Sequence, residues 1–390
     1  MSNRNVIDCS QAARITKVVA NTGYRKSSVP DLSWSLNPEN MATALKEISN
    51  WPKYDPTPLH NLPDVAAACS VRAVLYKDES KRFDLASFKA LGGSYAVASL
   101  VAEQKARGID AADITVTTAT DGNHGRSVSW GAQLAGCAAK IYIHENVSLA
   151  RERAMQSFGA DVIRVHGNYE ASLAVCKSDA AANGWHIVSD TSWEGYGDIS
   201  LRVMAGYSVM AHELLAQMED TSLTHAFIPV GVGGLAAAIV ARLWHAMGEN
   251  LCKVISVESH MSACFLESIA AQQPTPIEIS QETLMAGLSC GEVSDLAWDI
   301  LLPTVSHCLS ITDDAVAPLM RFLGRDADSE NRIEAGECST SGLAALMAAK
   351  RDVQLWSELD FNKDSVVLLI GTEGATDPDL YKSIMNSSAI

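Results

Sequence analysis

The chain has 390 residues, of which 47% are hydrophobic and 19% are charged, a composition typical of globular rather than disordered proteins. Its length suits two lobes or one large α/β unit. The formal net charge of −16 argues against nucleic acids and anionic membranes as partners, because no basic surface is available to neutralise phosphates.

Several features indicate a cytoplasmic protein. The first segment, MSNRNVIDCSQAARITK, lacks the apolar core of a secretory signal. The most apolar long stretch, Ala226–Trp244, contains Pro229, Arg242 and three glycines, which disfavours a membrane span. The nine cysteines form no CxxC pair and do not have the spacing of a zinc site. We therefore expect reduced, buried thiols and no metal.

Strand and helix patterns alternate through the middle of the chain. A β-rich run returns roughly every two dozen residues with a helical pattern between, which is typical of parallel βαβ units. The predicted strands are Ile114–Thr118, Lys140–His144, Val162–Val165 and His186–Ser189, and the predicted helices are Arg126–Ala135, Leu149–Phe158 and Glu170–Ala182.

A second series of elements follows. It comprises further parallel strands, a helix after a glycine-rich turn, and two irregular regions, in order Ala226–Val230, Leu235–Met247, Lys253–Val257, Gln273–Gly291, Arg325–Ser341 and Val366–Ile370. We predict an α/β fold of two lobes with parallel sheets flanked by helices. The small lobe would span residues 93–199, inserted into a large lobe of residues 1–92 and 200–390.

Lys89 lies in the segment ASFKALGGS, between Phe88 and the pair Ala90-Leu91. A lysine on a helix flank, with its stem along apolar surface, would explain this environment. The chemical interpretation is an amine in partly apolar surroundings, where loss of hydration lowers its pKa and frees it as a nucleophile. The segment alone leaves both interpretations open.

The segment TATDGNHGR, residues 118–126, follows one predicted strand and precedes one predicted helix. Backbone amides in such a turn can bind an anion. Asp121, Asn123 and His124 would project into the crevice at the carboxyl end of a parallel strand, where α/β folds bind ligands. A plain capping turn explains Asp121 and Gly122 but not the whole DGNHG string, so we favour a ligand site.

The glycine run in PVGVGGLAAAI, residues 229–239, stands between a predicted strand and a predicted helix. Such a run can approach a phosphate through bare backbone N–H groups. It also resembles the start of a dinucleotide fingerprint, for which Glu258 could supply the acidic residue. The segment alone does not exclude an NAD-dependent oxidoreductase.

The last segment of interest is LLIGTEGATD, residues 368–377, a buried-type strand that ends in small and polar residues. Thr372 would stand at the carboxyl end of this strand, where its hydroxyl could meet a ring nitrogen. An ordinary exit from strand to loop explains the segment equally well without its context.

Taken together, the four segments resemble the pyridoxal-phosphate enzymes of the tryptophan synthase β-subunit fold, called fold type II. The resemblance rests on their order along the chain: a lysine segment, a DGNHG turn, a glycine loop and a late strand ending in threonine. Within that fold the chain most resembles the diaminopropionate ammonia-lyases, over nearly its whole length. The matching segments are FKALGGSYAV, TATDGNHGRSVSWGAQLAG, SDTSWEGYGDI, TLMAGLSCGEVSDLAWDIL and GTEGATDP.

The resemblance implies pyridoxal 5'-phosphate as cofactor and a role for each matching residue. Lys89 would carry it as a Schiff base, Asn123 would hydrogen-bond its phenolic oxygen, and Thr372 would contact its pyridine nitrogen. Backbone N–H groups would hold its phosphate, from Gly231, Val232, Gly233, Gly234 and Leu235. Two departures from the family pattern stand out, Val232 in place of a frequent glycine, and Glu337-Cys338-Ser339 in place of Glu-Ser-Gly.

The activity implied by the resemblance is elimination of ammonia from a small amino acid, 2,3-diaminopropionate in its D or L form, giving pyruvate and ammonia. Asp121 and Asp190 match positions around the substrate, and we propose them as bases on its opposite faces, assisted by Lys89. Asp190 could instead cap the turn Thr191–Trp193. Relatives are commonly dimers, so we expect a homodimer.

Three other activities remain as alternatives. A dehydratase or lyase of the same fold would act on serine, threonine or 3-hydroxyaspartate, but such dehydratases usually carry serine at the position of Asp121. An NAD-dependent oxidoreductase would leave Lys89 without a role. A catalytically silent cofactor-binding protein fits poorly with so complete a set of candidate groups. Whether Cys264 and Cys290 pair is open as well.

Overall fold

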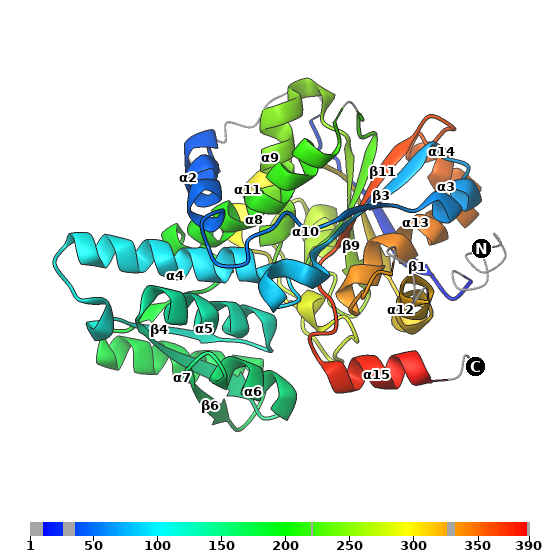
Figure 1. The fold of residues 1–390 in the computed structure, drawn as a ribbon. Helices are drawn as coiled ribbons and strands as arrows, with labels where there is room; N and C mark the ends of the chain where they lie inside the picture. Colours follow the sequence, from blue (N-terminus) through cyan, green and yellow to red (C-terminus); the bar gives the residue numbers. More distant parts are fainter. Residues whose placement is uncertain (1–10, 26–35, 220, 326–331, 388–390) are drawn as a thin grey trace.

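The computed structural model describes residues 11–25, 36–219, 221–325 and 332–387. These residues form two sheets, one of seven strands and one of four, flanked by helices (Figure 1). The predicted α/β fold with parallel sheets and flanking helices is therefore confirmed.

The seven-stranded sheet is parallel at its centre and antiparallel at both edges. Edge strands of opposite direction close the ends of an otherwise parallel sheet, a frequent arrangement in large sheets. In spatial order its strands are β1 (Ile15–Ala20), β10 (Val305–Ile311), β9 (Lys253–Ser259), β8 (His225–Pro229), β11 (Val366–Gly371), β3 (Ala73–Asp78) and β2 (Leu59–Asn61).

Helices cover both faces of this sheet because its central strands are apolar on both sides. Along β8, Ala226 and Ile228 belong to one core with the helix α9 (Gly234–Met247), whereas Phe227 belongs to a second core with α13 (Ser341–Arg351). All five residues of β8 are buried, as expected for a central parallel strand.

The four-stranded sheet is entirely parallel. Its order is β6 (Asp161–Val165), β5 (Ala138–His144), β4 (Thr115–Ala119) and β7 (His186–Ile187), and its connecting helices are α5 (Asn123–Ala135), α6 (Leu149–Gln156) and α7 (Tyr169–Asn183). Ser148 caps α6 by accepting the N–H of Arg151, and Gly159 has a φ of +85° shortly after its end. Figure 1 shows this sheet and its helices as one side of the molecule.

Two long helices join the sheets, α4 (Lys89–Ala106) and α8 (Asp198–Gln217). They approach so closely that a Cβ on Gly206 would lie 2.4 Å from the carbonyl oxygen of Leu91. On its other side α4 meets α5, where a Cβ on Gly131 would lie 2.6 Å from the Cα of Ser94. These close contacts fix α4, and therefore Lys89 at its first position. The predicted domain boundaries, 92/93 and 199/200, fall within α4 and α8 and remain a proposal.

Further helices pack around the large sheet. They are α2 (Pro38–Ile48), α3 (Pro63–Cys69), α10 (Cys264–Ala271), α11 (Asp295–Leu301), α12 (Val316–Gly324), α14 (Val353–Glu358) and α15 (Pro378–Asn386). The region Gln273–Gly291 contains only a short 3-10 turn, as predicted. Part of the region Arg325–Ser341, also predicted to be irregular, lies outside the described residues, and its end forms the 3-10 turn Cys338–Thr340.

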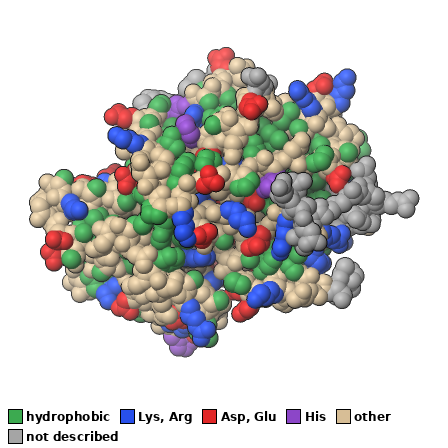
Figure 2. Space-filling view, viewed as in Figure 1, with side chains coloured by type: hydrophobic (Ala, Val, Ile, Leu, Met, Phe, Trp, Pro, Cys, Tyr) green, Lys and Arg blue, Asp and Glu red, His purple; other side chains and the backbone are tan. Residues whose placement is uncertain are grey.

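No helix in the described part of the chain is long and apolar enough to cross a membrane. The eight cysteines among the described residues are free thiols, six of them buried, and Cys264 and Cys290 do not pair. Acidic and basic side chains are interspersed over the face shown in Figure 2.

Candidate active site

The structure brings together the four segments singled out in the sequence. The main-chain N–H of Phe88, beside Lys89, donates to the carbonyl oxygen of Thr372 at 3.0 Å. The Asn123 amide donates to Glu373 at 2.5 Å, which ties the DGNHG turn to the same strand end. Thr372 directly follows β11, as predicted, so the carboxyl end of the central sheet forms the floor of this site.

Lys89 forms an ion pair with Asp190, in which Nζ donates to Oδ2 and both side chains are 18% exposed. Burial alone would lower the pKa of Lys89, but the Asp190 carboxylate outweighs burial and raises that pKa above its ordinary value. Burial would likewise raise the pKa of Asp190, whereas the Lys89 ammonium lowers it. The expected lowering of the Lys89 pKa is therefore wrong for this state of the protein, because the pair holds the proton on the amine.

The segment that precedes Lys89 has a strained backbone. Phe83, Asp84 and Ala86 have φ values of +52°, +58° and +51°, in the left-handed region that side chains rarely adopt. Hydrogen bonds hold this conformation, since the carbonyl oxygen of Ala86 accepts the N–H of Gly374 at 2.8 Å. The strain is thus stored where the chain turns to present Lys89.

A buried network of charges anchors the start of the same segment. Arg82 donates to Glu79 at 2.8 Å and to Glu213 at 2.7 Å, and Lys77 donates to Glu213 at 3.0 Å. The four side chains are at most 1% exposed. Because two positive and two negative charges are paired, the network avoids the cost of an isolated buried charge. No pattern in the sequence indicated this network, since Glu213 lies more than a hundred positions from its partners Lys77 and Arg82.

Asp121 occupies a more open position than Asp190. Its side chain is 39% exposed and pairs with the ring of His144 at 3.0 Å. The hydrogen bond with Asp121 raises the pKa of His144. Arg151 donates to the main-chain carbonyl oxygen of Asp121 at 3.2 Å, and so fixes the turn from outside. The two predicted bases therefore lie in different environments, one with an ammonium partner and one with an imidazole.

Two buried polar groups beside the ion pair lack hydrogen-bond partners among the described residues. They are Nδ1 of His124 and the hydroxyl of Tyr207. His124 Nδ1 lies 3.9 Å from Asp190, and burial lowers the pKa of this histidine, so its ring is neutral at neutral pH. Tyr207 on α8 packs its ring against Phe88. Sequence patterns gave no sign of Tyr207, which lies in an otherwise ordinary helix.

The glycine loop before α9 suits a phosphate. None of the described residues accepts a backbone hydrogen bond from the N–H groups of Gly231, Gly233, Gly234 or Leu235. Gly233 has a φ of +96°, and a Cβ there would lie 2.8 Å from the Cβ of Ala297. Free N–H groups at a helix N-terminus attract an anion. This loop fits the phosphate of the predicted cofactor.

The remaining groups also match pyridoxal phosphate. Lys89 supplies an amine, and Asn123 supplies an amide held by Glu373 beside Thr372. Thr372 is 3% exposed. Among the described residues, its hydroxyl has a single long contact, 3.4 Å to the hydroxyl of Ser339. A hydroxyl with free hydrogen-bonding capacity can meet a ring nitrogen. The donor set therefore agrees with the sequence-based assignment, which remains a prediction for each residue.

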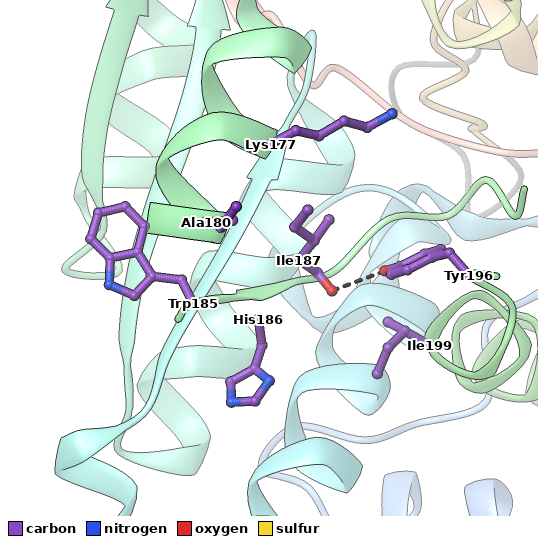
Figure 3. A pocket seen from close by; sticks show the side chains of 8 residues that line it. Lys177, Ala180, Trp185, His186, Ile187, Tyr196 and Ile199 are labelled. Atoms are coloured by element: carbon purple, nitrogen blue, oxygen red, sulfur yellow. Dashed lines mark hydrogen bonds between the residues drawn. The ribbon is translucent and has the colours of Figure 1, made fainter. Parts of the chain in front are cut away.

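The loop that carries Asp190 is fixed by hydroxyl groups. The Tyr196 hydroxyl donates to the carbonyl oxygen of Ile187 at 2.9 Å (Figure 3). The same hydroxyl accepts the N–H of Ser189. Ser192 shares a hydrogen bond of 2.7 Å with Ser294, whose N–H donates to Val232 of the glycine loop. The pocket drawn in Figure 3 borders this loop at Tyr196 and is lined by none of the predicted site residues.

Glu258 decides against the dinucleotide interpretation of the glycine loop. It is completely buried, and its carboxyl oxygens accept the N–H groups of Phe265 and Leu266, both at 2.8 Å. A carboxyl group committed to a helix N-terminus in the core has no access to a ribose hydroxyl. Glu258 therefore excludes a dinucleotide site formed by the glycine loop and this carboxylate, and with it the NAD-dependent oxidoreductase.

Comparisons with known proteins agree with this site. The family model described as "Pyridoxal-phosphate dependent enzyme" matches residues 51–371. Diaminopropionate ammonia-lyase of Escherichia coli (strain K12) is 36% identical over 85% of this chain and 87% of its own length. The enzyme of the same name from Salmonella typhimurium is 32% identical over 86% of this chain and 89% of its own.

Comparisons with solved structures lead to the same family. The E. coli diaminopropionate ammonia-lyase in complex with D-serine has a TM-score of 0.88 and 32% identity, and the match covers 96% of this chain and 98% of that one. Its complex with an aminoacrylate–PLP azomethine reaction intermediate has a TM-score of 0.87 and 34% identity, with the same coverage. Maize serine racemase, at 20% identity and a TM-score of 0.72, shares the fold. This chain therefore belongs to the family of pyridoxal-phosphate dependent enzymes and groups within it with the diaminopropionate ammonia-lyases.

Proposed function

We propose that this chain is an ammonia-lyase that uses pyridoxal 5'-phosphate to convert 2,3-diaminopropionate and water into pyruvate and two molecules of ammonia. The observation that carries the proposal is the ion pair of Lys89 and Asp190, an amine and a carboxylate held together at the carboxyl end of the sheet. The relatives named diaminopropionate ammonia-lyase, at 36% and 32% identity, support the substrate.

The residues of the site would hold the cofactor at both ends. Lys89 would hold it covalently through its amine, and the N–H groups of residues 231–235 would bind its phosphate. Asn123 and Thr372 would hydrogen-bond its ring. When bound, pyridoxal phosphate supplies an electron sink for the electron pair left on the substrate Cα.

Two carboxylates would move the protons. Asp190 would take the Cα proton from the side of Lys89, to which it is already paired, and Asp121 would take it from the other side. The β-amino group would leave with its proton as ammonia. Two carboxylates also attract a substrate that carries a second ammonium group. A base on each face would allow both enantiomers to react.

The test is to assay Asp121→Asn and Asp190→Asn with D- and L-diaminopropionate separately, measuring pyruvate and ammonia. We expect each variant to lose activity mainly on one enantiomer, by about 10²-fold or more. Asp161→Asn, an exposed carboxylate paired with Lys140, serves as the control and should keep full activity. Full activity of both site variants on both enantiomers would refute the two-base proposal.

A second candidate activity is supported by one finding, the D-serine bound to the E. coli relative. Elimination of water from serine, threonine or 3-hydroxyaspartate would use the same residues. A panel of these amino acids beside diaminopropionate decides between the two, because the preferred substrate has the highest kcat/KM. We also infer a homodimer in the cytoplasm, which sedimentation of the purified protein and cell fractionation would test.

A further inference from the structure

Glu337 and Glu373, two buried carboxyl groups at the edge of the site, have no part in the function derived so far. Glu373 follows Thr372 at the end of β11 and is 7% exposed. Its Oε2 accepts the Asn123 amide at 2.5 Å, and its Oε1 accepts the main-chain N–H of Cys338 at 3.3 Å. Both oxygens are therefore held, one by the DGNHG turn and one by the segment of Glu337.

The bond to Glu373 decides which way the Asn123 amide faces. A side-chain amide has two N–H donors and one acceptor oxygen. Because one N–H is committed to Glu373, the amide cannot turn its oxygen into that position without placing it against a carboxylate. The second N–H then remains as a donor. An amide of fixed orientation is what an acceptor oxygen on a cofactor ring requires.

Glu337 directly precedes Cys338, whose N–H donates to Glu373, but its carboxyl group has a different electrostatic environment from that of Glu373. Its residue is 6% exposed, and the hydrogen-bond partner of its carboxyl group is its own main-chain N–H. A buried carboxylate without a charged partner is costly, and the cost disappears when the group takes up a proton. Burial, reinforced by the charge of Glu373, raises the pKa of Glu337 to about 7.

The charges around Glu337 come from three elements. Glu373 at the end of β11 and Asp377 at the N-cap of α15 oppose its ionisation, whereas Arg151 of α6 favours it. When Glu337 loses its proton, it adds a negative charge to this buried corner, which disfavours an anionic oxygen on the cofactor.

We propose that Glu373 and Glu337 are positioning residues of the cofactor site: Glu373 orients the Asn123 amide, and Glu337, whose chain neighbours Gly336 and Cys338 both donate to Glu373, sets the charge beside that bond. The proposal rests on pyridoxal phosphate as the ligand of this site. It assigns a role to Glu373, in the matching segment GTEGATDP, and to Glu337, in a segment that departs from the family pattern.

The first test uses the cofactor-free protein and infrared difference spectroscopy. Wild type is expected to show the C=O stretch of a protonated carboxyl group at about pH 6 and to lose it by about pH 8. Glu337→Gln should lose the part of this change that is centred at about pH 7, whereas the part from Glu258 persists. Glu334→Gln is the matched control, because Glu334 lies in the same segment and does not contact Asn123. Glu258→Gln identifies the signal of Glu258, another buried glutamate whose pKa is raised. An undiminished pH-dependent band in Glu337→Gln would overturn the proposal.

The second test uses the holoenzyme, with the affinity and absorbance of bound pyridoxal phosphate as readouts. Glu373→Gln should raise the Kd about tenfold or more and shift the absorbance maximum, because the charged anchor of Asn123 is lost. Wild type should bind more weakly above about pH 7 than below it, and Glu337→Gln should lose this dependence.

The midpoint of unfolding of Glu373→Gln distinguishes a positioning role of Glu373 from a role in packing. A packing defect would lower the midpoint without shifting the absorbance maximum of the bound cofactor. Wild-type affinity and absorbance in Glu373→Gln would overturn the role of Glu373. If wild type itself bound no pyridoxal phosphate, the proposed function would fail, whereas the infrared result on the cofactor-free protein would stand independently.

Discussion

Replacing Gly233 with alanine tests whether the phosphate loop depends on a backbone that only glycine adopts easily. Gly233 has a φ of +96°, and an added Cβ would lie 2.8 Å from the Cβ of Ala297. The left-handed conformation costs a side chain about 1–2 kcal/mol, and overpacking costs about 1–3 kcal/mol more. We therefore expect the free energy of unfolding to fall by about 2–5 kcal/mol, or the Tm by about 2–6 °C for a chain of this length.

The matched control is Gly234→Ala, one residue along the same loop. There an added Cβ would lie 3.5 Å from the carbonyl oxygen of Asp190, an ordinary contact, and the backbone φ is not positive. Urea unfolding of the cofactor-free variants measures the difference, and titration with pyridoxal phosphate measures the loss of phosphate binding. Equal stability and equal cofactor affinity of Gly233→Ala and Gly234→Ala would refute this reasoning.

Three further predictions concern buried charges. Glu213→Gln leaves the buried cations of its network short of a carboxylate, and should lower the free energy of unfolding by about 3–5 kcal/mol in urea titrations. Asp190→Asn removes the partner that raises the pKa of Lys89, so an amine-specific reagent should label Lys89 at lower pH in the cofactor-free variant. Burial raises the pKa of Glu258 to about 8, so the folded state binds this proton more tightly than the unfolded chain, and stability should fall as pH rises from about 4.5 to 8, less steeply in Glu258→Gln.

Each of these predictions has an outcome that contradicts it. A loss below about 1 kcal/mol in Glu213→Gln would show that water or a local rearrangement replaces the carboxylate. An unchanged labelling profile in Asp190→Asn would show that the ion pair does not control Lys89. Identical pH dependence of stability in wild type and Glu258→Gln would show that this carboxyl group is ionised in the folded state.

The sequence predicted the central elements of the fold because their signals are local. Alternating strands and helices between residues 114 and 189 appear in the structure, as do the strands β8, β9 and β11. Strands β1, β2, β3 and β10 were missed. β3 and β10 follow the helices α3 and α11 and pair with β11 and β9, which are distant in sequence. Pairing across the sheet cannot be derived from either strand alone.

The site was predictable in its parts but not in its electrostatics. The order of motifs placed Lys89, Asn123, the glycine loop and Thr372 in one region, and the structure brings them there. The sequence could not show that Lys89 pairs with Asp190, because this contact spans 101 positions. The same holds for Glu373 and Asn123, which lie 250 positions apart. Contacts of this kind follow from the packing of the two sheets.

The most direct test of the account is borohydride reduction of the purified holoenzyme, followed by peptide mapping. Reduction makes the bond between the cofactor and its lysine permanent, so the labelled peptide identifies that lysine. The account predicts one labelled site, Lys89, and loss of the label in Lys89→Ala. A label on another lysine, or an enzyme that forms pyruvate from diaminopropionate without any label, would contradict it.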